Sequence, residues 1–164
     1  MSEPASFSPT RFDGNNVAWA NELVGPFVIG FVSSALRSEA QVIDGTELYT
    51  QRSLTDFQHV YRWAKSGFAR SGGRIVPAGD VSAAEYEHHI SVAQAVYDMD
   101  MLNGYGALSP AEVQRLVGWS LKTSDSYAWM YTEAYDWRAT GWPSTQVPAD
   151  YLVAVEQARQ SWTP

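Results

Sequence analysis

The chain has 164 residues and a formal net charge of −7, and its 45% hydrophobic residues are enough to build one core. The negative charge repels phosphate backbones and anionic lipids, so we expect no nucleic-acid and no membrane partner. Cysteine is absent, which excludes disulfides and thiolate metal sites, and the N-terminus lacks the basic and apolar segments of a signal peptide. We therefore expect a soluble chain and leave its compartment open.

The first half of the sequence predicts an irregular arm followed by helices and a strand. Residues 1–16, rich in Ser, Pro, Asn and Gly, predict the arm, and residues 17–164 predict a single α/β domain. A helical pattern over 17–36 is interrupted at Gly25-Pro26, and AQVIDG at 40–45 predicts a short buried strand. Ser53 as an N-cap, followed by apolar residues at spacings of three and four, predicts a helix to about residue 69.

The second half continues the alternation of helices and strands. Residues 83–89 predict a helix, whereas ISVAQAVYDMDM at 90–101 fits either a buried strand or a continuing helix. Ser109-Pro110-Ala111-Glu112 predicts a helix start with a capping box. A strand is predicted over 127–132, and Pro148 opens a last helix to about residue 161. This order is typical of a parallel α/β fold.

Two glutamates follow predicted strands. Glu47 comes two residues after VIDG, and Glu133 comes directly after AWMYT. Ligands of parallel α/β folds gather at the carboxyl ends of the strands, and glycosidic cleavage needs two acids, one as proton donor and one as nucleophile or base. We therefore predict Glu47 and Glu133 as a catalytic pair with Asp44 beside them. The alternative is that each glutamate is a solvated loop residue or a partner of a helix cap.

Aromatic residues make up 13% of the chain and gather at the ends of predicted elements, which favours a ring-lined surface. In the strand over 127–132, Tyr127, Trp129 and Tyr131 share one face and Met130 lies on the other. In a barrel the face with the three rings would lie under the helices. We predict that a sugar contacts Asp44, Tyr49, Tyr97, Asp98, Tyr131, Tyr135 and Trp137. For Tyr97 and Asp98 the alternative is a polar patch at a helix end.

Metal and cofactor motifs are weak in this sequence. Glu85 and His88 form a Glu-x-x-His pair, but a di-metal bundle needs two such pairs and two further glutamates. The sequence has no HExxH, no phosphate loop and no GxSxG elbow. We predict neither a metal nor a cofactor, with His88 and His89 as surface or hydrogen-bonded residues.

Several segments, in order, resemble a known family. VIDGTELY, SVAQAVYDMDML, LSPAEVQRLVGWSLKTSDSYAWMYTEAYDW and VPADYLVAVEQAR are similar to the C-terminal part of bacterial glycoside-hydrolase-like (β/α)8 barrels. The resemblance spans roughly residues 27–159. It implies that Asp44 with Glu47, Tyr97 with Asp98, and Tyr131 with Glu133 lie at three strand ends.

A full barrel takes about 250 residues and at least about 200, so 164 residues correspond to roughly its last half. We therefore predict a partial, half (β/α)8-type barrel that cleaves a glycosidic bond. Two copies of the chain or a partner chain would complete the barrel, or the chain is a truncated fragment. The rival interpretations are a non-catalytic carbohydrate-binding module and a protein-interaction module.

Overall fold

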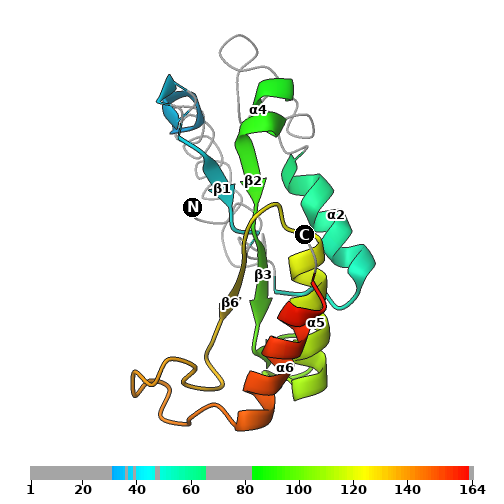
Figure 1. Ribbon diagram of the computed structural model, residues 1–164, viewed down its shortest axis with the longest axis vertical. Helices are drawn as coiled ribbons and strands as arrows, with labels where there is room; N and C mark the ends of the chain where they lie inside the picture. Colours follow the sequence, from blue (N-terminus) through cyan, green and yellow to red (C-terminus); the bar gives the residue numbers. More distant parts are fainter. Residues whose placement is uncertain (1–30, 36, 39, 47–48, 66–82, 163–164) are drawn as a thin grey trace, which may run out of the picture. The chain divides into compact units, whose positions relative to one another are not determined.

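The computed structural model describes residues 31–35, 37–38, 40–46, 49–65 and 83–162 (Figure 1). These residues belong to two compact units. Unit 1 draws on Met1–Asp44 and Arg62–Ser91, and unit 2 draws on Gly45–Tyr61 and Val92–Pro164. The predicted arm over 1–16, most of the predicted helix over 17–36, and Glu47 lie outside the described residues.

Unit 1 contains β1 (Val42–Asp44), α4 (Ala83–His89) and the first residues of β2 (Ile90–Val92). β1 and β2 form a two-stranded sheet, and the Gln41 side-chain amide donates a hydrogen bond to the Ser91 hydroxyl. Residues 31–35 are helical, as predicted. The strand predicted from AQVIDG and the helix predicted over 83–89 are both confirmed.

Unit 2 is built on a parallel pair of strands, β3 (Gln94–Tyr97) and β6 (Ala128–Tyr131), which lie side by side in Figure 1. Val96 pairs with Met130, and Tyr97 pairs with Tyr131. The short strands β4 (Met99–Asp100) and β5 (Gly106–Ala107) form an antiparallel pair. The segment over 90–101 is therefore strand, not helix. Every residue from 90 to 98 is buried, whereas a helix on a small core would expose one side.

The helix α5 (Pro110–Lys122) covers one face of the β3–β6 pair, and α6 (Ala149–Gln160) packs against α5 (Figure 1). α5 begins with the predicted capping box, since the Ser109 hydroxyl accepts from the Glu112 N–H and the Glu112 carboxylate accepts from the Ser109 N–H at 2.9 Å. α6 follows Pro148. The buried core consists of Phe57, Val96, Leu108, Val113, Leu116, Val117, Tyr151 and Ala158.

The two faces of β6 are the reverse of the barrel-based prediction. Met130 packs against the core under α5, while Tyr131 points away from it and is 42% exposed. The prediction that the three rings lie under the helices was therefore wrong. The physical reason is the pairing of Met130 with Val96, because these two apolar side chains share the face that α5 covers.

A further helix, α2 (Leu54–Lys65), follows the N-cap Ser53 as predicted. The Ser53 N–H donates to the Asp56 carboxylate at 2.8 Å, and the Asp56 N–H donates to the Ser53 hydroxyl at 3.2 Å. Phe57, in its first turns, is 1% exposed and belongs to the core of unit 2. The carbonyl of Phe57 accepts from the buried Gln94 side-chain amide at 2.9 Å, which ties α2 to β3.

The structure is thus a mixed α/β fold with short parallel strands. None of the helices in the described part of the chain has the length and hydropathy needed to cross a lipid bilayer. The single domain predicted over 17–164 stays a prediction, because residues 17–30 and 66–82 are not among those described.

Candidate functional site

Tyr97 and Tyr131 end the paired strands, and both of their hydroxyls donate to the carboxylate of Glu133. Tyr131 Oη donates to Glu133 Oε1 at 2.9 Å, and Tyr97 Oη donates to Glu133 Oε2. The parallel register places the two tyrosines opposite each other, with ring centroids 5.3 Å apart. Each oxygen of Glu133 therefore has its own tyrosine donor, although the glutamate itself is exposed.

The hydrogen bonds between the two tyrosines and Glu133 shift the pKa of both Glu133 and Tyr97. Hydrogen bonds from Tyr97 and then Tyr131 lower the pKa of Glu133 below its usual range. Burial raises the pKa of Tyr97, and the hydrogen bond to Glu133 raises it further. At neutral pH Glu133 is consequently ionised and Tyr97 protonated. Glu133 can accept hydrogen bonds, attack an electrophile or take a proton, but it has no proton to donate.

Four rings in mutual contact, two of which bind this carboxylate, form what we call the aromatic cluster: Tyr49, Tyr97, Trp129 and Tyr131. Tyr49 stacks on Tyr131 with centroids 5.8 Å apart and planes 25° apart. Tyr49 also lies 5.3 Å from the Tyr97 ring and meets Trp129 edge-on at 6.0 Å. The cluster combines a buried tyrosine, 6% exposed, with an exposed ring at Tyr131.

The segment that carries Tyr49 is hydrogen-bonded to β6 and to the residue before β3. Trp129 Nε1 donates to the Gly45 carbonyl at 2.8 Å, and the buried Thr46 hydroxyl donates to the Ala93 carbonyl at 3.0 Å. Tyr49 has a positive φ of 52°, a conformation that non-glycine residues rarely adopt. Arg52 holds it, because its guanidinium donates to the Tyr49 carbonyl at 3.2 Å. The Tyr49 ring is thus positioned by both ends of its segment.

Asp98 follows β3 directly and organises the segment after β6. Its side chain is fully buried, and its carboxylate accepts from the backbone N–H of Glu133 at 2.9 Å and of Ala134 at 3.2 Å. It also accepts from the Tyr135 N–H at 3.4 Å and from Trp137 Nε1 at 3.1 Å. Asp98 therefore fixes the backbone at Glu133 and has no exposed surface for a ligand.

Tyr135 and Trp137 face the core side of this segment. Both are partly buried and pack against Tyr151, at centroid distances of 4.8 Å and 6.2 Å. The Tyr151 hydroxyl donates to the Leu108 carbonyl at 2.6 Å. In this arrangement the two rings anchor the segment after β6 on the helical core.

A second buried carboxylate, Asp136, shapes the following turn. It is 2% exposed and accepts from the N–H groups of Arg138 at 3.2 Å, Thr140 at 3.0 Å and Gly141. The side-chain amide of Gln146 adds a further donor at 3.2 Å. Burial by itself raises the pKa of Asp136, but the N–H donors outweigh burial and hold it at about 2.

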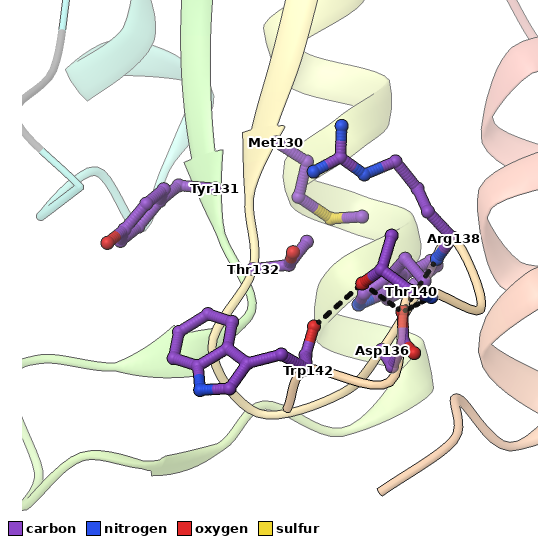
Figure 2. Close-up of a pocket in the computed structure, with 8 residues that line it drawn as sticks. Met130, Tyr131, Thr132, Asp136, Arg138, Thr140 and Trp142 are labelled. Carbon is purple, nitrogen blue, oxygen red and sulfur yellow. Dashed lines mark hydrogen bonds between the residues drawn. The ribbon is translucent and has the colours of Figure 1, made fainter. Parts of the chain in front are cut away.

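A pocket of about 350 Å³ lies between this turn and the end of β6 (Figure 2). It is lined by Met130, Tyr131, Thr132, Asp136, Trp137, Arg138, Thr140 and Trp142. Tyr131 belongs both to the pocket wall and to the aromatic cluster. The pocket and the aromatic cluster therefore share one residue.

The structure brings together part of the predicted site. Tyr97 and Tyr131 both donate to Glu133, and the Tyr49 ring contacts the rings of these two tyrosines. Asp44 lies at the end of β1 in unit 1, and Glu47 is outside the described residues. The geometry thus contains one of the two predicted acids together with its aromatic surroundings.

Sequence reasoning missed Asp136 and the pocket behind it. The available signal was DWRATG at 136–141, since an aspartate shortly before a glycine often hydrogen-bonds to the following backbone N–H groups. Gly141 does adopt a positive φ of 86° there. Arg138 and Trp142 carry no signal of their own, because their shared pocket depends on how this turn is folded.

Two negative findings accompany this geometry. Over the described ranges, no three His, Cys, Asp or Glu residues are grouped so that they could hold a metal ion. The chain matches none of the family models, curated proteins or solved structures with which it was compared.

Asp98→Asn should lower the free energy of unfolding by about 1–3 kcal/mol, because an amide N–H₂ would face N–H donors that now share a carboxylate. Chemical denaturation followed by tryptophan fluorescence would measure this. Asp150→Asn, which removes the same charge from an exposed position, is the control and should change stability by less than about 0.5 kcal/mol. Equal stability of the two variants would contradict the anchoring role of Asp98.

Asp136 should contribute to loss of stability in acid. Its pKa is about 2 in the folded protein and 3.8 as usual for an unfolded aspartate, so its contribution is present above about pH 4 and is lost as the pH falls towards about 2. Denaturation curves measured between about pH 2 and pH 4 give the free energy of unfolding at each pH. This free energy should fall less steeply with decreasing pH for Asp136→Asn than for the unchanged protein. If the free energy of unfolding falls equally with pH in both proteins, the N–H donors do not stabilise the ionised Asp136 carboxylate.

Proposed function

We propose that this chain is a carbohydrate-active protein that binds a sugar at the aromatic cluster and cleaves a glycosidic bond with Glu133 as the ionised carboxylate. The observation that carries the proposal is the donation of two tyrosine hydroxyls to the two oxygens of Glu133 at the ends of parallel strands. This arrangement fixes the position of a carboxylate and keeps it charged, which a nucleophile or general base needs.

The surroundings of Glu133 suit a sugar ring. A pyranose presents apolar C–H faces that pack on aromatic rings, and hydroxyl groups that donate to carboxylates. Tyr131 offers an exposed ring next to the exposed Glu133 carboxylate, and Tyr49 stacks behind it. Both kinds of contact are therefore available at the same strand ends.

The lowered pKa of Glu133 assigns it one of the two acid roles. Glu47 would then be the proton donor: it protonates the glycosidic oxygen while the bond from that oxygen to the anomeric carbon breaks. Glu133 would either attack the anomeric carbon or take a proton from the water that attacks it. In the sequence Glu47 stands two residues before Tyr49, whose ring stacks on Tyr131 in the aromatic cluster.

Sugar binding without cleavage is the second candidate. It is favoured by the state of the two aspartates that flank Glu133 in this region. Asp98 and Asp136 are both buried and accept hydrogen bonds from backbone N–H groups. Neither one is placed to donate a proton to a ligand. The same aromatic cluster could hold a sugar, or a segment of a partner protein, with Glu133 only as a hydrogen-bond acceptor.

Our proposal includes the half (β/α)8-type barrel. It is supported by the parallel β3–β6 pair, by the helix α5 on one of its faces, and by the gathering of polar groups at the strand ends. In the described part of the chain β3 and β6 pair only with each other, so each leaves an edge that a further strand could occupy. A second copy of the chain is the simplest source of such strands.

Glu133→Gln should reduce kcat/KM on a cleaved glycoside by at least about 100-fold while leaving substrate affinity nearly unchanged. Tyr131→Phe should retain activity but shift the acidic limb of the pH–rate profile to higher pH, because loss of a hydrogen-bond donor raises the pKa of Glu133. A screen of aryl glycosides followed by pH–rate measurements would check both effects.

The same variants separate cleavage from simple binding. If the chain only binds sugars, no glycoside is cleaved, and Tyr131→Ala weakens sugar affinity more than Glu133→Gln does. Failure of the chain to bind any of the glycosides screened would contradict both cleavage and sugar binding. Tyr127→Phe, at an exposed ring on the other end of the strand segment, is the matched control and should change neither activity nor affinity.

The molar mass in solution should be that of two chains of 18.2 kDa if self-association completes the barrel. Light scattering coupled to size-exclusion chromatography would measure it over a range of concentrations. A well-folded monomer at every concentration would contradict closure by a second copy.

A further inference from the structure

The pocket beside the aromatic cluster has the size of a ligand site. Its volume of about 350 Å³ falls within the range of roughly 300–1,000 Å³ typical of small-molecule pockets. Figure 2 shows the rings of Tyr131 and Trp142 on one side of Thr132 and the Arg138 side chain on the opposite side. Trp142 is 68% exposed, so its ring is available for stacking.

Two charged residues line this pocket, but only one of them is open to a ligand. Asp136 is 2% exposed, and the turn that follows it supplies hydrogen-bond donors to both of its oxygens. Arg138 is exposed, and within the described residues its guanidinium makes no hydrogen bond and no ion pair. The charge that the pocket presents is therefore positive, although the chain carries a net charge of −7.

The backbone holds Arg138 in place at the base of its side chain. Its N–H donates to Asp136 Oδ1 at 3.2 Å, and the same carboxylate oxygen accepts from the Thr140 N–H and the Thr140 hydroxyl. Figure 2 shows the side chain extending from this turn towards Met130. A guanidinium offers a planar pair of N–H donors that matches a carboxylate.

We infer that this pocket binds the carboxylate-bearing sugar unit of an acidic glycan, with the carboxylate on Arg138 and the sugar face on Trp142. The inference rests on the proposed carbohydrate function and specifies its substrate class. Tyr131 connects the two places, since it lines the pocket and donates to Glu133. An acidic unit in the pocket would thus adjoin the unit bound at the aromatic cluster.

Isothermal titration with short uronate oligosaccharides and their methyl esters tests this assignment, because the ester keeps the sugar and removes the charge. Galacturonate, glucuronate and mannuronate trisaccharides are the probes. We expect at least one acid to bind about tenfold more tightly than its ester, and Arg138→Gln to abolish that preference. Trp142→Ala should weaken binding of acid and ester alike.

Arg159→Gln is the matched control, because it changes the net charge equally at an exposed position on α6. It should leave the preference for the acid unchanged, which separates a local contact from the overall field of the protein. The inference is overturned if the esters bind as tightly as the acids, or if Arg138→Gln retains the preference for the acid. In either case, binding of the esters at the aromatic cluster would leave the proposed carbohydrate function standing. Absence of binding to all acids, all esters and neutral sugars would overturn both.

Discussion

Unit 2 depends on the hydrogen bonds that the buried Asp98 carboxylate accepts. A carboxylate inside a protein is costly unless donors surround it, and here the donors are backbone N–H groups at Glu133, Ala134 and Tyr135 with the indole of Trp137. Because Asp98 follows β3 and its donors follow β6, one side chain joins the ends of both strands. The position of Glu133 is a consequence of this connection.

The same region separates structural carboxylates from an accessible one. Asp98 and Asp136 are buried, and their carboxylates accept hydrogen bonds from backbone N–H groups. They therefore hold the conformation of the segment after β6. Glu133 is exposed, and its hydrogen-bond donors are tyrosine side chains. A tyrosine hydroxyl can give up its hydrogen bond to Glu133 and form one to a ligand. This difference in donors, more than the number of acids nearby, is why we place the chemistry at Glu133.

Local features of the fold could be read from the sequence where they depend on neighbouring residues. The capping box at Ser109 and Glu112 and the N-cap at Ser53 were both predicted, since the hydrogen bonds at these helix starts span only three residues. The segment over 90–101 stayed ambiguous because a fully buried strand has no alternation to detect. The direction of the β6 rings was predicted wrongly, because it depends on where α5 packs.

The sequence by itself determined the helices that begin near Ser53, Ala83, Ser109 and Pro148, the strands β1 and β6, and the gathering of tyrosines with a glutamate near strand ends, because periodicity and capping act over a few residues. Only the tertiary structure decided that Tyr97 and Tyr131 share Glu133, that Asp98 is an anchor, and that Arg138 and Trp142 line one pocket. Tyr97 and Glu133 are 36 positions apart. Contacts across such a separation follow from strand register and helix packing, which no local pattern of residues encodes.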